Sequence, residues 1–484
     1  MNIDYSLFFR AMQPESLLIE AALAIIILDL TVMRRKDLSA RLNVASLVGA
    51  LAVALAAVLA LRNGAMGEIL NGVLNLDTLA VATRVGVLGL TLLVLGIGTG
   101  GARIRNPAEY VVIVLCAAVG FMLMASAQQL LLVFLALELA SLSLYVLAGF
   151  DKSRPESAEA GLKYFLFGGM AAAFLLFGFS LLYGLTGTLD LPGMSVVMAA
   201  TGFHPMLAVA MVMILVGFGY KAAAAPFHLW APDAYQGAPA PAAAFIASAS
   251  KLAGFVLFTR LLWGSASQGQ MLGATPGWVP VVWLLAGASM LVGNLAALAQ
   301  SNVRRLLAYS AIAHAGALLL GVIASGRSGP GPLFFYLTTY GIATAGAFGV
   351  FHVLENQGGA QKLKDLAGLH RRSPLLAGCL MVFILSLAGV PPLSGFFGKF
   401  AVFAAALSPA GLGSPTGWLA VFAIAMSAVG LYYYLLILKE ALVRPAAAGA
   451  TAVKVPAAAA LTLVAAAGLT LIFGMFPSLL LRWF

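Results

Sequence analysis

The chain has 484 residues, of which 62% are hydrophobic and only 9% are charged, and its mean hydropathy is +1.01. Soluble globular domains carry about a quarter charged residues, so this composition excludes a soluble fold and predicts an all-α polytopic membrane protein. A net charge of +10 at pH 7 is compatible with nucleic acid as a partner, but the placement of the basic residues argues against it. Cys116 and Cys379 both lie in apolar segments, which favours packing roles over a disulfide or a metal site.

Apolar segments of about 20 residues, the length that spans a bilayer, recur along the whole chain. Residues 1–16 lack the basic stretch and cleavage site of a signal peptide, so we expect the first span to be retained. We predict fourteen transmembrane helices, at residues 17–33, 44–61, 79–97, 110–127, 130–150, 164–185, 206–230, 239–263, 279–298, 306–324, 333–354, 375–407, 418–438 and 457–476.

Lysine and arginine are distributed unequally among the loops between these spans. Eighteen lie in the odd-numbered loops, and five lie on the opposite side when both termini are included. Because basic residues gather in cytoplasmic loops, this bias predicts that both termini lie on the outer side of the membrane. It also accounts for the positive net charge without nucleic acid.

Two predicted spans, the seventh and the twelfth, are interrupted by proline close to a lysine. Lys221 precedes Pro226 in the seventh span, and Lys399 follows the sequence GVPPLSG in the twelfth. Proline interrupts a helix, and freed backbone groups at membrane depth are tolerated next to protein or water. Since these spans run in opposite directions, both lysines would lie on the outer side of their breaks, as two inverted repeats would place them.

This pattern predicts a division of the chain into four parts. We expect an N-terminal three-helix segment at residues 1–107, inverted repeats at 108–263 and 264–440, and a C-terminal span at 441–484.

Ionisable side chains inside the spans are the candidate functional residues, because charge within a membrane is costly and usually has a use. Glu138 shares a helix face with Ser141 and Tyr145, and is a candidate partner for Lys221. Burial disfavours a charged lysine and a nearby carboxylate favours it, so the pair predicts reversible protonation. The alternatives are a structural carboxylate and lysines that extend toward the membrane surface. The four candidates are Glu138, Lys221, Lys251 and Lys399.

Two histidines are candidate proton relays between the lysines, namely His228 just beyond Pro226 and His314 in the tenth span. The alternative for each is a hydrogen-bonded structural group. Asp233 is expected to bind backbone groups of its own loop, whereas Glu20 and Asp29 in the first span have no evident partner.

The remaining patterns predict no cofactor site in this chain. Residues 96–101 match the dinucleotide pattern GxGxxG, but no strand precedes them, so nucleotide binding is not expected. The sequence contains no cysteine cluster for an iron–sulfur centre, no histidine pairing for haem and no phosphate-binding loop. We therefore expect neither a metal nor a redox centre here.

Five segments between the fifth and twelfth spans carry a resemblance to a known family. They are LALELASLSLYVLAGF, SAEAGLKYFLFGG, GYKAAAAPFHLWAPDAYQGAPAPAAAFIASASKLAGF, NVRRLLAYSAIAHAG and LSLAGVPPLSGFFGKF. They resemble the antiporter-like membrane subunits of NADH–quinone oxidoreductase, respiratory complex I, and within that family the subunit N group. Lys399 disfavours the subunit M group, which usually has Glu there, and the end of the chain soon after the last span disfavours subunit L.

The resemblance implies a role for each candidate. Glu138 and Lys221 match the family's Glu–Lys pair, Lys251 its central lysine and Lys399 its terminal one. The family translocates protons across the bacterial inner membrane, driven by quinone reduction elsewhere in the complex. NADH, FMN, iron–sulfur clusters and quinone would then belong to partner subunits, including the peripheral NADH-oxidising arm. A subunit of a multi-subunit cation/proton antiporter or of a membrane-bound hydrogenase shares these motifs and remains the alternative.

Overall fold

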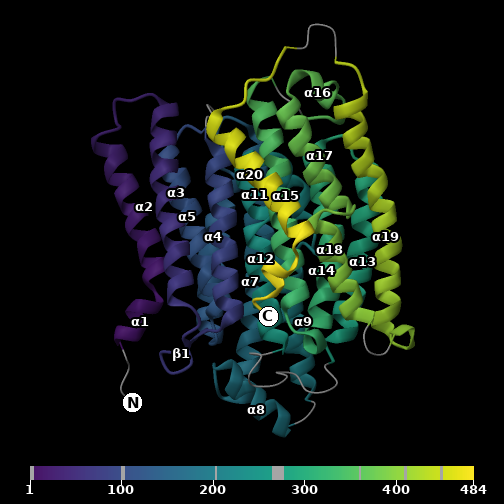
Figure 1. The fold of residues 1–484 in the computed structure, drawn as a ribbon. Coiled ribbons are helices and arrows are strands. Elements are labelled where there is room, and N and C mark those ends of the chain that lie inside the picture. Colours follow the sequence, from purple (N-terminus) through teal and green to yellow (C-terminus); the bar gives the residue numbers. More distant parts are fainter. Residues whose placement is uncertain are drawn as a thin grey trace.

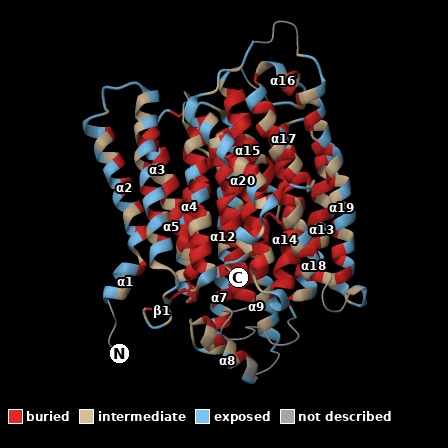
Figure 2. Ribbon diagram, viewed as in Figure 1, coloured by how far each residue is buried: buried red, intermediate tan, exposed pale blue. Residues whose placement is uncertain are grey.

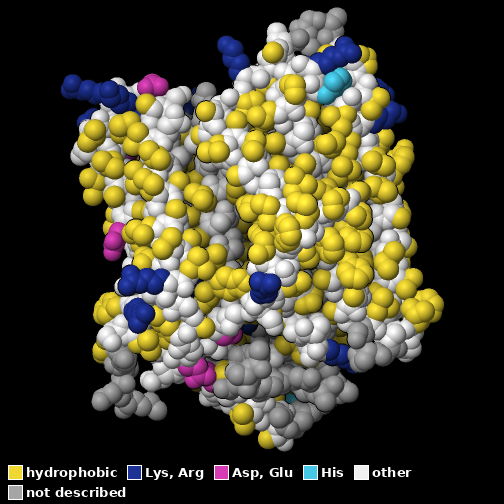
Figure 3. Space-filling model, in the orientation of Figure 1, with side chains coloured by type: hydrophobic (Ala, Val, Ile, Leu, Met, Phe, Trp, Pro, Cys, Tyr) yellow, Lys and Arg dark blue, Asp and Glu magenta, His cyan; other side chains and the backbone are white. Residues whose placement is uncertain are grey.

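Long helices lie side by side in this computed structural model, and apolar side chains cover the middle of the face seen in Figure 3 (Figures 1 and 3). The structure describes residues 5–99, 104–201, 204–263, 277–358, 361–407, 411–446 and 451–484. The first helices are α1 (Tyr5–Ala11), α2 (Gln13–Thr31), α3 (Leu38–Asn63), α4 (Thr78–Gly98), α5 (Pro107–Ser126), α6 (Leu130–Ala148), α7 (Pro155–Thr186), α8 (Leu191–Thr201), α9 (Pro205–Ala222), α10 (Trp230–Gly237), α11 (Ala240–Ala247) and α12 (Ala249–Trp263).

The second half of the chain is equally helical. It contains α13 (Val279–Leu298), α14 (Val303–Ser328), α15 (Gly331–Asn356), α16 (Leu369–Arg372), α17 (Pro374–Ala388), α18 (Ser394–Leu407), α19 (Pro415–Leu438), α20 (Ala457–Met475) and α21 (Ser478–Leu481). Short helical turns are η1 (Leu363–Leu366), η2 (Gly411–Gly413) and the π-helical η3 (Lys439–Val443). The strands β1 (Gly67–Ile69) and β2 (Leu74–Leu76) pair as one antiparallel hairpin.

The described residues contain twelve helices that are long and apolar enough to cross a membrane, and the bent pair α1–α2 makes up to thirteen. The shorter apolar helices α17 and α18 occupy the predicted twelfth span. The predicted all-α polytopic membrane fold is therefore confirmed. The count of fourteen spans and the two inverted repeats stay predictions.

Helices in the centre of the molecule are shielded from the surroundings, whereas helices at its edge are not. All of the apolar window of α11–α12 and of α15 is buried, and so is 94% of that of α14, but only 33% of that of α7. Figure 2 shows the same contrast between the buried centre and the more exposed α2 and α3. The centre is where ionisable side chains can be kept away from lipid.

Both predicted helix breaks are confirmed, and in each the helix ends at a residue with left-handed backbone. Helix α9 ends before Ala223, with φ of 56°, and α17 ends before Gly389, with φ of 86°. The backbone N–H of Ala225 donates to Ser289 Oγ of α13 at 2.8 Å, and that of Gly395 donates to Ser386 Oγ at 3.1 Å. Neighbouring hydroxyls thus satisfy backbone groups that each break releases.

The predicted eighth span, residues 239–263, is also broken, so the expectation of one continuous helix there was wrong. Ser248, with φ of −113° and ψ of −83°, separates α11 from α12, and its hydroxyl donates to the carbonyl of Ala244 at 2.6 Å. No proline marks this break in the sequence. Lys251 follows it by one turn.

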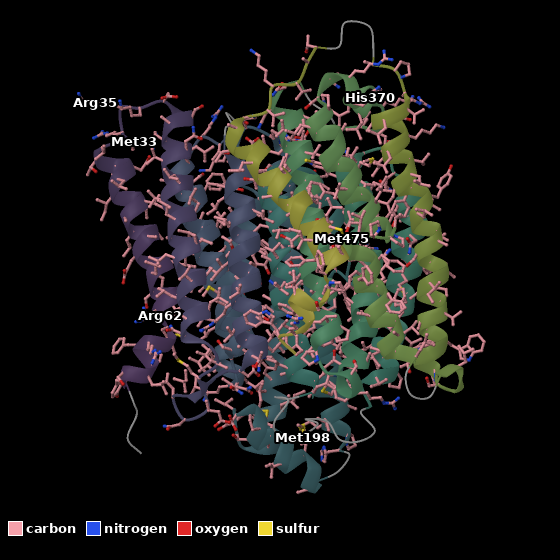
Figure 4. The ribbon with its side chains drawn as sticks, viewed as in Figure 1. Met33, Arg35, Arg62, Met198, His370 and Met475 are labelled. Atoms are coloured by element: carbon pink, nitrogen blue, oxygen red, sulfur yellow. The ribbon has the colours of Figure 1, made fainter. Side chains whose placement is uncertain are left out.

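The loops predicted to share one side of the membrane do lie at one end of the molecule where Figure 4 labels them. Arg35 and His370 lie at the same end, and Arg62 lies toward the opposite end (Figure 4). The predicted boundary between the repeats adjoins residues 264–276, which are outside the described residues, as are residues 100–101 of the GxGxxG pattern.

Candidate functional site

Lys221 is buried in the last turn of α9 and faces the polar stripe of α6. Its Nζ donates to Ser141 Oγ at 3.1 Å and lies 5.8 Å from the centre of the Phe121 ring. Glu138, one turn before Ser141, is partly buried and lies close enough to Lys221 for the two charges to interact. Among the described residues, the structure shows no direct ion pair between Glu138 and Lys221. The Lys221 ammonium group instead donates a hydrogen bond to Ser141.

Lys221 and Lys251 are brought together through α12. A Cβ built at Gly254 would lie only 3.2 Å from Lys221 Cγ, so the Lys221 side chain packs directly on this glycine. Gly254 is one helical turn past Lys251. The Lys221 side chain therefore lies against α12 one turn from Lys251, and the absence of a side chain at Gly254 makes room for it.

Lys251 of α12 forms a hydrogen bond to α14. It is 3% exposed, and its Nζ donates to the carbonyl of Ala311 at 2.5 Å. The same Nζ lies 5.6 Å from the centre of the Tyr340 ring of α15. That ring also packs on His314, with 4.8 Å between the ring centres.

His314 lies one turn past Ala311 and contacts two tyrosines from different helices. Its Nδ1 is 2.6 Å from the hydroxyl of Tyr336 on α15, and its Nε2 is 3.0 Å from that of Tyr434 on α19. Ser310 also hydrogen-bonds the Tyr434 hydroxyl. Both ring nitrogens of this buried histidine are thus in a hydrogen-bonded chain.

Lys399 lines a cavity together with His314, Tyr336 and Tyr434. The hydroxyls of these two tyrosines hydrogen-bond His314. Its Nζ donates to the carbonyl of Ala388 at 3.0 Å, where the partial negative charge of the α17 C-terminus favours a cation. The polar lining provides the partners that a bridging water needs. The cavity is lined by Met290, Asn294, Ala313, His314, Ala317, Tyr336, Lys399, Ala423, Met426, Ser427, Gly430, Tyr433 and Tyr434.

His228 is not brought into this group. It is partly buried beyond the first break, and its Nδ1 is buried without a hydrogen-bond partner. Among the described residues, no hydrogen bond joins its side chain to Lys221, Lys251 or His314. Its relay role stays a prediction.

Tyr336 and Tyr434 are members of the site that the sequence analysis missed. Each lies in an apolar helix far from the lysines in sequence, and tyrosines in such helices usually pack. The only available signal was their polar hydroxyl. Spatial convergence on His314 is what distinguishes them.

The expectation for Asp233 was wrong, because its carboxylate binds side chains of other helices rather than its own loop. Lys163 Nζ of α7 donates to Oδ2 at 2.7 Å, and Arg305 of α14 donates to Oδ1 at 2.5 Å. Burial raises the pKa of this carboxyl, but the hydrogen bonds from Lys163 and Arg305 outweigh it, so the pKa lies below its ordinary value. Asp233 therefore ties α10 to α7 and α14.

Asp29 has a partner that the sequence did not reveal. Arg41 of α3 binds both of its carboxylate oxygens. Within the described residues, no group of three His, Cys, Asp or Glu side chains could hold a metal ion. The lysines, the histidine and the tyrosine hydroxyls gathered here are groups that can exchange protons with one another and with water.

Comparison with known proteins identifies the class of protein that carries this site. The pattern of the family described as "NADH:quinone oxidoreductase/Mrp antiporter, TM" matches residues 127–427, which include all four candidate carboxylate and lysine residues. The chain belongs to this family of membrane subunits.

Full-length relatives narrow the assignment to the NADH–quinone oxidoreductase branch. NADH-quinone oxidoreductase subunit N 2 of Acidobacterium capsulatum is 46% identical, over 99% of this chain and 99% of its own length. A chain of respiratory complex I from Thermus thermophilus is 36% identical, with a TM-score of 0.81, 97% of this chain covered and 98% of that one. These similarities place the chain among the antiporter-like, proton-pumping membrane subunits of NADH–quinone oxidoreductase.

A more distant structural neighbour shares only the fold. A chain of the Mrp complex from Dietzia sp. has a TM-score of 0.82, with 98% of this chain covered and 96% of that one, but only 22% identity. The fold alone therefore does not separate respiratory subunits from antiporter subunits.

Proposed function

We propose that Glu138, Lys221, Lys251 and Lys399 carry protons through this chain, with His314, Tyr336 and Tyr434 linking the last two lysines. The observation that supports this path is a line of buried contacts, polar at Lys221, Lys251, His314 and Lys399, and apolar where the Lys221 side chain packs on Gly254. It leads from Ser141 through Lys221, Gly254 and Lys251 to His314, and then through the shared cavity to Lys399.

The first step of the path depends on charge. Lys221 is buried, which disfavours its ammonium form, and Glu138 favours that form when it is ionised and close. A change in the distance or charge of Glu138 would then release or reload the Lys221 proton. His228 is partly buried beyond the first break and would exchange protons with the path through water.

Energy for this movement comes from outside the chain. We infer that quinone reduction in neighbouring subunits drives it, with FMN and iron–sulfur clusters in the peripheral NADH-oxidising arm. The chain would lie in the bacterial inner membrane with both termini outside, as its loop charges predict. Left-handed residues at Ala223 and Gly389 end the two broken helices alike, which supports inverted repeats at 108–263 and 264–440.

The test is a Lys221→Ala substitution in the assembled complex. The tagged chain should still migrate with NADH dehydrogenase activity on a native gel. Proton pumping by vesicles that oxidise NADH should fall roughly tenfold or more, because a positioned proton-transfer group contributes on the order of 10²-fold or more. Lys152→Ala, at an exposed lysine, is the matched control and should leave pumping unchanged. Wild-type pumping by an assembled Lys221→Ala complex would refute the proposed path.

A further inference from the structure

The outward face of α2 carries an acidic side chain that the proposed proton path does not use. Glu20 is exposed, and it lies on a stripe with Ile19, Leu23, Ile27 and Leu30, which are 51%, 58%, 61% and 65% exposed. The spacing of these residues puts them on one side of the helix. Figure 1 shows α2 at the margin of the molecule, where its packing partners are α3 and α5.

Glu20 lies too far from the polar start of α2 for water there to solvate its charge. Polar groups gather at the start of this helix, where Asn63 Nδ2 donates to the carbonyl of Arg10 at 2.9 Å and to Gln13 Oε1 at 3.4 Å. Glu20 follows Gln13 by seven residues, about 10 Å along the helix axis. An exposed carboxylate at that position would face hydrocarbon, where a charge is costly.

No group of the described chain neutralises this carboxylate. Neither an ion pair nor a hydrogen bond reaches the Glu20 side chain from the residues that the structure describes. Asp29, on the same helix, differs because Arg41 binds it within the chain. Arg62 lies at the end of α3, beside the polar groups at the start of α2.

We propose that the Glu20 face of α2, defined by Ile19, Glu20, Leu23, Ile27 and Leu30, docks a transmembrane helix of a neighbouring membrane subunit, and that this helix supplies a lysine or arginine to Glu20. Charge complementarity selects this occupant. Lipid tails carry no cation, and lipid head groups lie at the membrane surface rather than at the depth of Glu20. A facing helix would also bury Leu23 and Ile27.

Two substitutions test the proposal in the whole complex: Glu20→Leu and Glu20→Lys. The readout is the fraction of tagged chain that migrates with NADH dehydrogenase activity on native gels as detergent is increased. We expect Glu20→Leu to lower the retained fraction roughly tenfold, which corresponds to about 1.4 kcal/mol, and Glu20→Lys to lower it further. Glu156→Lys, at an exposed position of α7, is the control for a change of charge and should be retained like wild type.

A second measurement separates loss of docking from loss of folding. The thermal midpoint of the full-length chain produced without other subunits should be unchanged or raised by Glu20→Leu, because the chain offers Glu20 no partner. Retention of Glu20→Leu equal to or above wild type would overturn the proposal and show that this face contacts lipid. A dimer of the chain that Glu20→Leu dissociates would overturn it in favour of a second copy.

Discussion

Lys221 and Lys399, which lie toward the two ends of the proposed proton path, have different surroundings. Lys221 precedes its helix break, binds Ser141 and has the Glu138 carboxylate nearby. Lys399 follows its break, donates to the carbonyl of Ala388 and lies in a cavity with His314. Among the described residues that line this cavity there is no carboxylate.

This difference indicates two ways of controlling a buried ammonium group. In the proposed path, the Glu138 carboxylate would set the charge of Lys221 by approaching, withdrawing or becoming protonated. At Lys399 the C-terminus of α17 supplies a fixed partial charge, and in the proposed path the hydrogen-bonded His314 would be the exchange partner. The first arrangement suits a switch, and the second suits transfer onward along a chain of hydroxyls.

Removing the switch should have the largest effect. Glu138→Gln keeps the size of the side chain but removes its charge, so Lys221 would lose the group that favours its protonated form. We expect proton pumping per NADH oxidised in reconstituted vesicles to fall roughly tenfold or more, with assembly retained. Glu156→Gln, at an exposed carboxylate, is the control and should pump normally. Normal pumping with Glu138→Gln would show that the charge of Glu138 does not control Lys221.

Interrupting the hydroxyl chain at the other end should have a smaller effect. Tyr434→Phe removes the hydroxyl that lies 3.0 Å from His314 Nε2, but a water in the adjoining cavity can take its place in part. We expect pumping to fall by roughly 2- to 10-fold, since a neutral hydrogen bond contributes about 1 kcal/mol. Tyr432→Phe, at a neighbouring tyrosine that is 60% exposed, is the control. A defect of equal size in both variants would mean that the hydroxyl beside His314 has no special role.

The sequence was most informative where an ionisable residue, which is energetically costly in a membrane, lies in an apolar segment. Glu138, Lys221, Lys251 and Lys399 were found in this way, because charge within a membrane is conspicuous at any position. Prolines likewise indicated the breaks near Lys221 and Lys399. The break at Ser248 has no such residue, and its hydroxyl bond to the Ala244 carbonyl is of a kind that also occurs inside unbroken helices, so nothing in the sequence marks it.

Contacts between distant helices were beyond the sequence. Tyr336 and Tyr434 are ordinary members of apolar helices until their hydroxyls meet at His314. The same holds for Asp233, whose partners Lys163 and Arg305 lie 70 and 72 residues away. Spacing along one helix predicts a shared face, but it does not predict which faces of separate helices meet.

The two breaks also differ in how the chain beyond them is anchored. After the second break, a hydrogen bond from Gly395 to Ser386 fixes the start of α18 directly to α17. After the first break, α10 is held by ion pairs from Asp233 to Lys163 and Arg305. Only the first anchor depends on the ionisation of a carboxylate.

Asp233→Asn should therefore weaken the first anchor slightly and in a pH-dependent way. The folded-state pKa of Asp233 lies below its unfolded value, so its stabilisation is complete above about pH 4 and is lost as pH falls through the folded pKa. Because these side chains are partly exposed, each pair contributes about 1 kcal/mol or less. The thermal midpoint of the variant should lie below that of wild type at pH 7, and the two should converge at low pH. Glu156→Gln removes only an exposed pair with Arg154 at 3.7 Å, so its gap should be smaller than that of Asp233→Asn. An equal gap at both pH values for Asp233→Asn would mean that packing, rather than charge, anchors α10.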